Sequence, residues 1–284
     1  MLLRNTHKET TTWHELLEKY KHNFRISSLS CLLSTSSEEY LHSGAESKKA
    51  SKIVNGAIAQ SGEFPHQGSL RVYDQHICGC SIISNTHVLT AAHCVVNNDQ
   101  TMTVYQDMTV LTGTNDRSGQ RSGQLHKVIN IVYHEHYDPK NNWINDIAIL
   151  TLAKPITFNH FQHPINLPSR DLSPNTRVMA SGWGALTFAN PSSAPQILQK
   201  LDMTIVSNTE CSRAHSNRIY PGQICVFKGR GTGVCVGDSG GPLTFNNEVH
   251  GIASWVVPCA EGYPDVFTRV YYYLSWIRQH TRQY

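Results

Sequence analysis

Gly237-Asp238-Ser239-Gly240-Gly241-Pro242 is the most informative stretch of this 284-residue chain, because it places a serine hydroxyl in a glycine-rich turn. Glycine carries no Cβ, so the backbone N–H groups of such a turn can come close to a reacting group. A serine hydroxyl is a weak nucleophile that needs a base to take its proton. The oxyanion that it creates also needs fixed hydrogen-bond donors. So short a motif recurs by chance, and its interpretation depends on partners elsewhere in the chain.

The first partner lies in Thr90-Ala91-Ala92-His93-Cys94, where His93 is a candidate general base. The chain has 16 histidines, and any one of them is usually an ordinary surface or core residue. His93 stands out because it lies between small residues and a cysteine that can hold its loop in place.

The second partner is Asp146, which opens the apolar run Ile147-Ala148-Ile149-Leu150. A carboxylate at the start of such a run is expected to be partly buried, and a buried carboxylate needs a partner. An imidazole N–H suits it, so Asp146 would fix the tautomer of His93 and stabilise the imidazolium formed during attack. The alternative is an aspartate satisfied by backbone N–H groups at a strand end, which would be preferred without His93 and Ser239.

With these residues in the order His93, Asp146, Ser239, the chain resembles the trypsin/chymotrypsin family of serine endopeptidases from Ile53 to its C-terminus. The order discriminates, because the same triad on the subtilisin and α/β-hydrolase folds follows other chain orders. Further matching stretches are Ile53-Val54-Asn55-Gly56, Ser181-Gly182-Trp183-Gly184, Ser254-Trp255 and Pro264-Asp265-Val266-Phe267-Thr268.

The rest of the chain after residue 52 predicts an all-β fold. Short apolar runs, many of them β-branched, alternate with turns rich in Asn, Gly, Pro and Ser, which is typical of a barrel or sandwich. The runs span 87–90, 102–111, 128–133, 147–152, 178–181, 198–206 and 249–255. The resemblance implies two six-stranded antiparallel β-barrels, at about 53–167 and 175–269, with the active site in the cleft between them. A C-terminal helix is expected at about 270–281, with Tyr273, Trp276 and Ile277 on one face.

Residues 1–52 are expected to form a pro-region. They begin Met1-Leu2-Leu3-Arg4 and turn polar at once, which makes a poor signal peptide. The stretch 43–52 is small, polar and basic, as in a cleavable linker. The resemblance implies cleavage after Lys52 by a trypsin-like activating protease, after which the new ammonium of Ile53 would insert beside Asp238.

Eight cysteines indicate an oxidising compartment, so we expect a secreted, extracellular protein. Spacing alone leaves the pairing open. The resemblance implies the disulfides Cys78–Cys94, Cys211–Cys225 and Cys235–Cys259. Cys31 and Cys80 remain, and we expect Cys80 to be a buried, unreactive thiol. A Cys31–Cys80 bond is the alternative.

The resemblance also assigns the oxyanion donors and the specificity pocket. The N–H groups of Gly237 and Ser239 would hold the oxyanion. Trypsin-like enzymes carry an aspartate six residues before the nucleophile, and here that position is Gly233. The implied pocket residues are Gly233, Val234, Ser254, Trp255, Val256 and Asp265.

Val234 and Val256 predict a shallow, apolar pocket. Together with Gly233 and Asp265 they resemble the pocket of neutrophil elastase, in which valines screen the acid from the substrate. We therefore expect cleavage after Val, Ala, Ile or Leu. An unscreened Asp265 would instead resemble broad-specificity collagenolytic enzymes, which accept basic and large apolar side chains.

Composition argues against several other classes. The net charge of +3 and the lack of a long apolar run give no sign of a nucleic-acid or membrane partner. The loop 113–124, where some relatives bind calcium, offers Asp116 but no carboxylate cluster. His134 and His136 would share a face of a predicted strand, but no fourth zinc ligand is evident. We therefore expect no metal and no cofactor.

The expected partners are protein or peptide substrates, the activating protease and protein protease inhibitors, and we expect a monomer. The alternatives are chymotrypsin-like specificity, a catalytically silent binding homologue, and a serine hydrolase of lipid esters. The last requires another fold and another chain order.

Overall fold

A computed structural model describes residues 53–281, except 98–105, 121 and 258. The expectations for residues 1–52, including Lys52 and Cys31, therefore lie outside the described residues. Among the helices that are described, none is both long and apolar enough to span a membrane.

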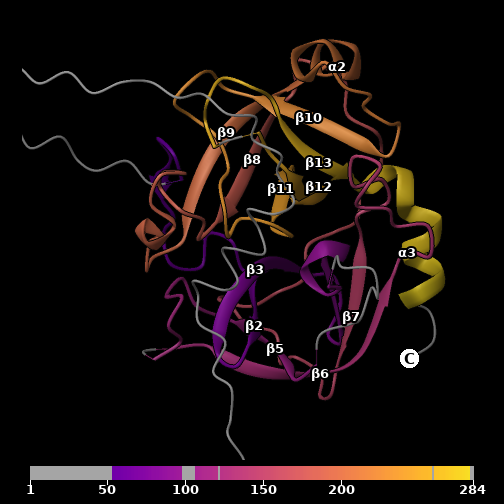
Figure 1. Cartoon of the computed structure of the whole chain (residues 1–284). Coiled ribbons are helices and arrows are strands. Elements are labelled where there is room, and N and C mark those ends of the chain that lie inside the picture. Colours follow the sequence, from indigo (N-terminus) through magenta and orange to yellow (C-terminus); the bar gives the residue numbers. More distant parts are fainter. Residues whose placement is uncertain (1–52, 98–105, 121, 258, 282–284) are drawn as a thin grey trace, which may run out of the picture. The chain divides into compact units, whose positions relative to one another are not determined.

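The first half of the described chain closes into a six-stranded antiparallel barrel. Its strands are β2 (Gln67–Val72), β3 (Gln75–Ile82), β4 (His87–Thr90), β5 (Met108–Thr112), β6 (Gln124–Tyr133) and β7 (Ala148–Leu152). They pair in the order β2-β3-β4-β7-β6-β5. Every residue of β4 and β7 is buried, so these two strands form the centre of the first core. In Figure 1 this barrel lies in the lower part of the picture.

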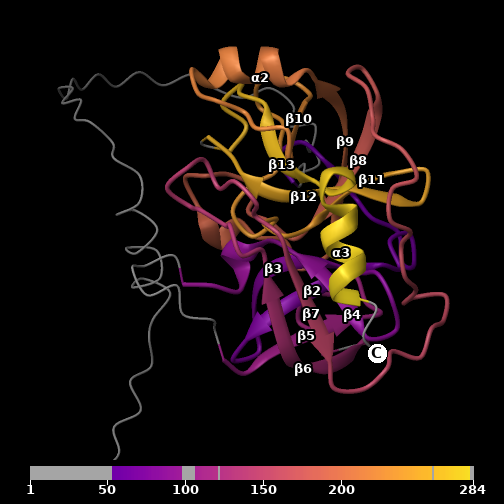
Figure 2. The ribbon, with the colours of Figure 1, turned by 90° about the vertical axis from the view of Figure 1, so that its right-hand side faces the viewer.

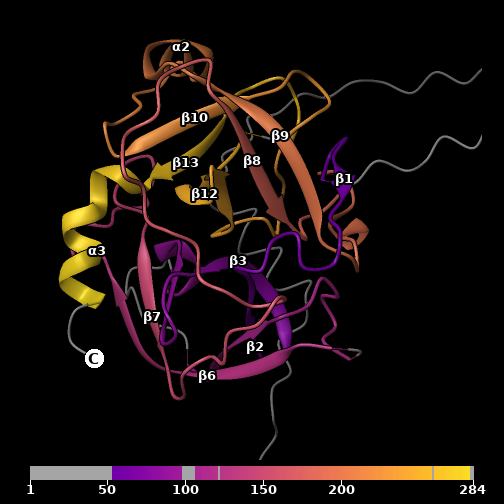
Figure 3. The same ribbon diagram turned by 180° about the vertical axis from the view of Figure 1, so that it is seen from behind.

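The second half forms another barrel, seen above the first in Figures 1 and 3. Its strands are β8 (Arg177–Gly182), β9 (Gln199–Val206), β10 (Gln223–Phe227), β11 (Pro242–Phe245), β12 (Glu248–Trp255) and β13 (Asp265–Arg269). The ring closes because β8 pairs with both β9 and β11, and the short β1 (Ala57–Ile58) adds to β9. The predicted pair of six-stranded antiparallel barrels is confirmed.

The C-terminal segment begins with a 3-10 turn, η3 (Val270–Tyr273), and continues as helix α3 (Leu274–Thr281). Trp276 and Ile277 are buried in the same apolar cluster as Leu70 and Val88 of the first barrel. The chain thus leaves the second barrel and packs α3 against the first, and Figure 2 looks onto this helix. Two further 3-10 turns, η1 (Ala92–Cys94) and η2 (Pro191–Ser193), and helix α2 (Asn208–His215) complete the described elements.

The expectation that His134 and His136 share the face of a strand is wrong. Strand β6 ends at Tyr133, where its pairing with β7 stops at Ala148. The chain then turns, with Tyr137 N donating to His134 O at 2.9 Å. The ring of His134 stacks on Trp276 with centroids 5.4 Å apart, so it helps to hold α3.

Candidate active site

His93 is held by two bonds to one carboxylate. It lies in η1, which follows β4, and its backbone N–H donates to Oδ1 of Asp146 at 2.9 Å. Its Nδ1 lies 2.8 Å from Oδ2 of the same residue. Because a carboxylate accepts, Nδ1 carries the proton and Nε2 is left as the acceptor. The side chains of His93 and Asp146 are 7% and 0% exposed, so water competes little for these bonds.

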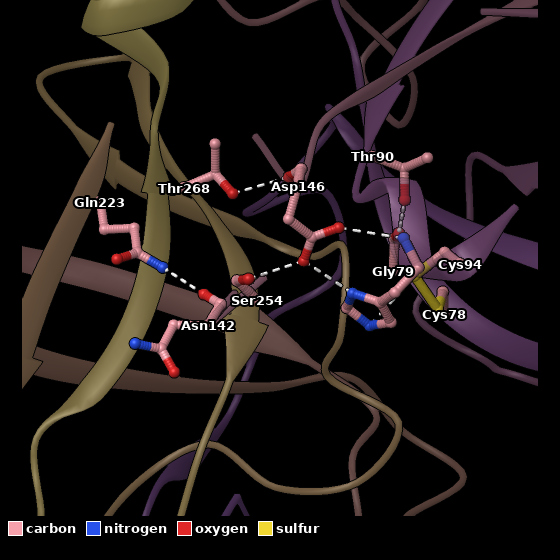
Figure 4. A network of polar contacts seen from close by, with 10 residues as sticks. Cys78, Gly79, Thr90, Cys94, Asn142, Asp146, Gln223, Ser254 and Thr268 are labelled. Carbon is pink, nitrogen blue, oxygen red and sulfur yellow. Dashed lines mark hydrogen bonds and ion pairs between the residues drawn. A yellow bond between two sulfur atoms is a disulfide. The ribbon is translucent and has the colours of Figure 1, made fainter. Parts of the chain in front are cut away.

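The second barrel also supplies donors to Asp146 (Figure 4). Ser254 Oγ, from β12, donates to Oδ2 at 2.6 Å, and Thr268 Oγ1, from β13, donates to the Asp146 carbonyl at 2.6 Å. A buried carboxylate requires such partners. Ser254 was predicted as a pocket residue; its role beside Asp146, and that of Thr268, have no local sequence signal.

Ser239 lies in the turn before β11, directly against the first barrel. Its carbonyl accepts from Gly79 N of β3 at 2.7 Å. A Cβ added to Gly240, where φ is +73°, would lie 2.3 Å from Thr90 Oγ1 and 3.1 Å from Cys94 Sγ. The turn therefore fits beside the residue that follows His93 only because position 240 is glycine.

The turn also presents two backbone N–H groups, those of Gly237 and Ser239. Within the described part of the chain, neither the backbone N–H of Gly237 nor that of Ser239 donates a hydrogen bond, and the Ser239 hydroxyl has no partner. Gly237 has a φ of +97°. Its carbonyl lies 2.9 Å from His76 Nε2, while His76 Nδ1 lies 2.8 Å from Ser69 Oγ. Burial lowers the pKa of His76 to about 4, so this ring is neutral and donates from Nε2. Sequence reasoning missed His76.

Asp238, beside Ser239, is buried. Its carboxylate accepts from Gly184 N at 2.7 Å and from Cys235 N at 2.9 Å. A Cβ on Gly182 or Gly184 would lie within 2.1 Å and 2.3 Å of this carboxylate, which explains both glycines of the Ser181–Gly184 stretch. Burial raises the pKa of Asp238 to about 6, although the two backbone donors oppose the shift. In the uncut chain Ile53 carries an amide nitrogen, so it brings no cation to this carboxylate.

Asp265 lies beneath the backbone of Gly233. A Cβ at position 233 would come within 2.8 Å of Asp265 Oδ2, so the carboxyl group takes the space of a side chain there. Val234 N donates to Oδ2 at 2.9 Å. Burial, and secondarily the charge of Asp238, raise the pKa of Asp265 to about 8. Asp265 and Val234 are 4% and 5% exposed, and the half-buried Val256 packs against the cluster that contains Val234.

In the described part of the chain, three disulfides join Cys78 to Cys94, Cys211 to Cys225 and Cys235 to Cys259. The first ties the residue after His93 to β3 (Figure 4). Cys80 is free and buried, and its pKa is raised by burial. Its sulfur fills the place of a side chain at Gly68, its partner across β2 and β3.

The described ranges contain one group of potential metal ligands, Cys78, His93 and Cys94, and a disulfide joins its two sulfurs. In the loop predicted to lack a calcium cluster, Asp116 Oδ1 accepts from Ser118 and from Gln196.

Comparisons with known proteins agree with this geometry. The model of the family described as Trypsin matches residues 53–277. Brachyurin of Leptuca pugilator is 36% identical over 233 residues, which cover 81% of this chain and 98% of that protein. Chymotrypsin-2 of Vespa crabro is 36% identical over 228 residues (80% and 99%), and trypsin I-P1 of Gallus gallus is 35% identical over 229 residues (80% and 88%). The chain belongs to the trypsin family and is a serine endopeptidase.

Proposed function

We propose that His93, Asp146 and Ser239 form the catalytic triad of this endopeptidase, and that it prefers small or medium aliphatic residues before the cut. The observation that carries the first part is the pair of hydrogen bonds from His93 to one buried carboxylate, which leaves Nε2 as the base. Nε2 lies 3.7 Å from Cys94 Sγ, the atom against which Gly240 of the Ser239 turn packs. The second part is supported by the burial of Asp265, whose carboxyl group accepts a hydrogen bond from Val234 N.

In this mechanism Ser239 Oγ attacks the peptide carbonyl while His93 Nε2 takes the hydroxyl proton. Asp146 stabilises the imidazolium that forms. The N–H groups of Gly237 and Ser239 donate to the oxyanion, and both are free of other acceptors within the described residues. His93 then gives its proton to the leaving amine, and water repeats the sequence on the acyl-enzyme. His76 acts as a positioning residue, because it holds the carbonyl of Gly237.

The specificity part of the proposal competes with two alternatives. The relatives include proteins named trypsin, chymotrypsin and brachyurin, so similarity alone does not select a pocket. We favour an aliphatic preference because the family resemblance places the half-buried Val256 in the pocket wall and because Asp265 is buried. Peptides varied only at the residue before the cut should be cleaved fastest with Val, Ala, Ile or Leu. A clear preference for Arg or Lys would mean that Asp265 is exposed to substrate.

Replacing Val256 with Gly should admit larger side chains. The change removes branched carbon atoms from the pocket wall, and each methylene in an apolar pocket is worth about 1–3 kcal/mol of discrimination. We expect the ratio of kcat/KM for Phe over Val before the cut to rise by about 10- to 100-fold. The rate of labelling by a small fluorophosphonate, which needs no deep pocket, is the control and should stay within about threefold. An unchanged ratio would contradict the role of Val256.

Replacing Asp265 with Asn should stabilise the protein more at high pH than at low pH. The folded pKa of Asp265, about 8, lies above its ordinary value, so the folded state holds a proton that the unfolded chain loses at about pH 4. Stability of the wild type therefore falls as pH rises from about 4 to about 8. Asp265→Asn lacks this loss. The difference in unfolding free energy between the variant and the wild type should therefore grow in favour of the variant, by on the order of a few kcal/mol, between about pH 4 and about pH 8.

Denaturant unfolding at pH 5 and pH 8.5, in proteins that also carry Ser239→Ala to prevent autolysis, measures this difference. The same Asp265→Asn change in active enzyme should leave cleavage after Val within about twofold. A difference in stability that does not change with pH would show that Asp265 is ionised throughout.

We further propose that the protein is secreted as a zymogen, is activated by a trypsin-like protease, and is regulated by protein inhibitors. The three disulfides support an oxidising compartment. The sequence alternative of a catalytically silent homologue is the rival: a fluorophosphonate should label the activated endopeptidase and would not label a silent homologue. Absence of labelling, after cleavage at residue 52 has been verified, would favour the rival.

A further inference from the structure

Arg71 and Arg117 lie close together, and within the described residues neither pairs with a carboxylate. Arg71, in β2, donates from Nη1 to the carbonyl of Arg117 at 2.8 Å and from Nη2 to the carbonyl of Asp74. Arg71 is 7% exposed, and its Nε has no hydrogen-bond partner. Arg117, in the loop between β5 and β6, is half-buried, and within the described part of the chain its guanidinium pairs with nothing. Burial and then the charge of Arg71 lower the pKa of Arg117.

The groups around the pair leave it positively charged. Asp74, at the tip of the β2–β3 hairpin, is exposed, and its charge raises the pKa of Arg71 against the lowering by burial. The carboxylate of Asp116 is directed to Ser118 and Gln196. His76 is neutral, and both arginines contribute to its lowered pKa. Asp74 is therefore the one nearby carboxylate among the described residues that can offset the two positive charges of Arg71 and Arg117.

The pair lies beside the turn of the nucleophile. Arg71 is directly opposite His76 in the β2–β3 ladder, and His76 Nε2 lies 2.9 Å from the carbonyl of Gly237. Gly237 is two residues before Ser239. His76 therefore links Arg71 to the turn of Ser239: it lies opposite Arg71 in the ladder and hydrogen-bonds the Gly237 carbonyl.

The positions of the specificity pocket and of His93 determine which part of a substrate would reach Arg71 and Arg117. The residue before the cut enters the pocket around Gly233 and Val256, in the second barrel. The leaving amine must approach His93, which gives it a proton, and the disulfide after His93 joins its loop to β3. The segment after the cut therefore runs along the side of β3, where its neighbour β2 carries Arg71.

We propose that Arg71 and Arg117 form a binding site for an acidic side chain in the first three residues after the cut. The site rests on the proposed function, since it needs the substrate orientation that the triad sets. Guanidinium groups bind carboxylates through charge-assisted, often bidentate hydrogen bonds. Within the described residues the half-buried guanidinium of Arg117 has no acceptor, so it supplies the donors for a carboxylate. Arg71 is buried and holds the Arg117 carbonyl, so it contributes positive charge and fixes the loop that carries Arg117.

The test uses internally quenched peptides that are identical before the cut and carry Glu, Gln or Lys at the first, second or third position after it. At one position the active wild-type enzyme should cleave the Glu peptide with a kcat/KM about three- to tenfold above that of the Gln peptide, with Lys lowest. This preference should shrink as salt is added, because a partly exposed charge pair is screened.

Arg117→Gln separates recognition from folding. The backbone carbonyl that binds Arg71 is retained, so the loop keeps its anchor. We expect the Glu-to-Gln ratio to fall close to one, while cleavage of the Gln peptide stays the same. Arg278→Gln is the matched control, since it removes the same charge from an exposed position on α3 and should not change the ratio. Asp74→Asn should raise the ratio, because it removes the competing acid.

Equal cleavage of Glu and Gln peptides at all three positions, or a Glu preference that survives Arg117→Gln, would overturn the site. In either case, cleavage of the Gln peptide would leave the proposed function standing. If no peptide is cut and a fluorophosphonate does not label the protein, both proposals fail together.

Discussion

Replacing Ser239 with Ala is expected to lower kcat by about five to six orders of magnitude and to leave the fold unchanged. Loss of the nucleophile in a triad removes nearly all catalysis except what the oxyanion donors and substrate binding provide. The hydroxyl of Ser239 makes no hydrogen bond within the described residues, so its removal breaks no native contact there. The backbone bond from Gly79 to the carbonyl of Ser239 is retained.

The measurement is single-turnover and steady-state cleavage by purified variants, with thermal unfolding as the test of fold. Ser275→Ala, at an exposed position on α3, is the matched control and should retain full activity. His93→Ala should cost about as much as Ser239→Ala, and the double variant little more, because residues that act as a unit are not additive. Activity that persists in Ser239→Ala, once a contaminating protease is excluded, would overturn the assignment.

The two-barrel architecture was largely predictable from the sequence, but some strands have no local sequence pattern that identifies them. Strands β4 and β9 coincide with apolar, β-branched runs. β3 has the sequence QHICGCSI, in which polar residues, glycine and cysteine interrupt any simple alternation. Its burial comes from the closed barrel, which encloses the strand regardless of local pattern. The resemblance to a known family was needed to supply such strands.

Helix α2 shows a second limit. Of its eight residues only Cys211 is buried, so the segment has no apolar stripe to reveal a helix. A capping box does mark its start: Glu210 N donates to Ser207 Oγ at 3.1 Å, and Ser207 N donates to Glu210 Oε2 at 3.0 Å. The Ser-x-x-Glu spacing could have identified this end from sequence alone.

The candidate site divides in the same way. Residue type and order suggested His93, Asp146 and Ser239, because each carries chemistry that the others need. The second partners of Asp146, Ser254 and Thr268, are 108 and 122 residues away along the chain. Contacts of that kind depend on the packing of one barrel against the other, which no local pattern records.

Asp238→Asn should reduce the activity of the cleaved enzyme by about 100- to 4,000-fold. Ile53 is 0% exposed in the apolar cluster of the second barrel, so its side chain already lies where an inserted terminus would begin. In the uncut chain its φ is +43°, a costly value for a β-branched residue. That torsion includes the carbonyl carbon of the preceding residue, so cleavage after Lys52 abolishes it. The new ammonium can then neutralise the buried carboxylate of Asp238.

Loss of one partner from a buried ion pair costs about 3–5 kcal/mol, which gives the expected factor. Pairing raises the pKa of the ammonium above its ordinary value of about 8, so the active arrangement should be complete below pH 8 and lost as pH rises through the raised pKa. The activity of the cleaved wild type should therefore fall as the pH rises through the pKa of the ammonium, whereas the residual activity of Asp238→Asn should not show this fall.

The cleavage step is tested by N-terminal sequencing of the active species. Lys52→Gln should block activation by a trypsin-like protease. The matched change Lys49→Gln should not, because it keeps the Lys52–Ile53 bond that the protease cuts. An active species that begins upstream of Ile53, or full activity in Asp238→Asn, would contradict the model. Either result would mean that the turn proposed to hold the oxyanion, whose N–H groups at Gly237 and Ser239 make no hydrogen bond within the described residues, is held in place without the ammonium.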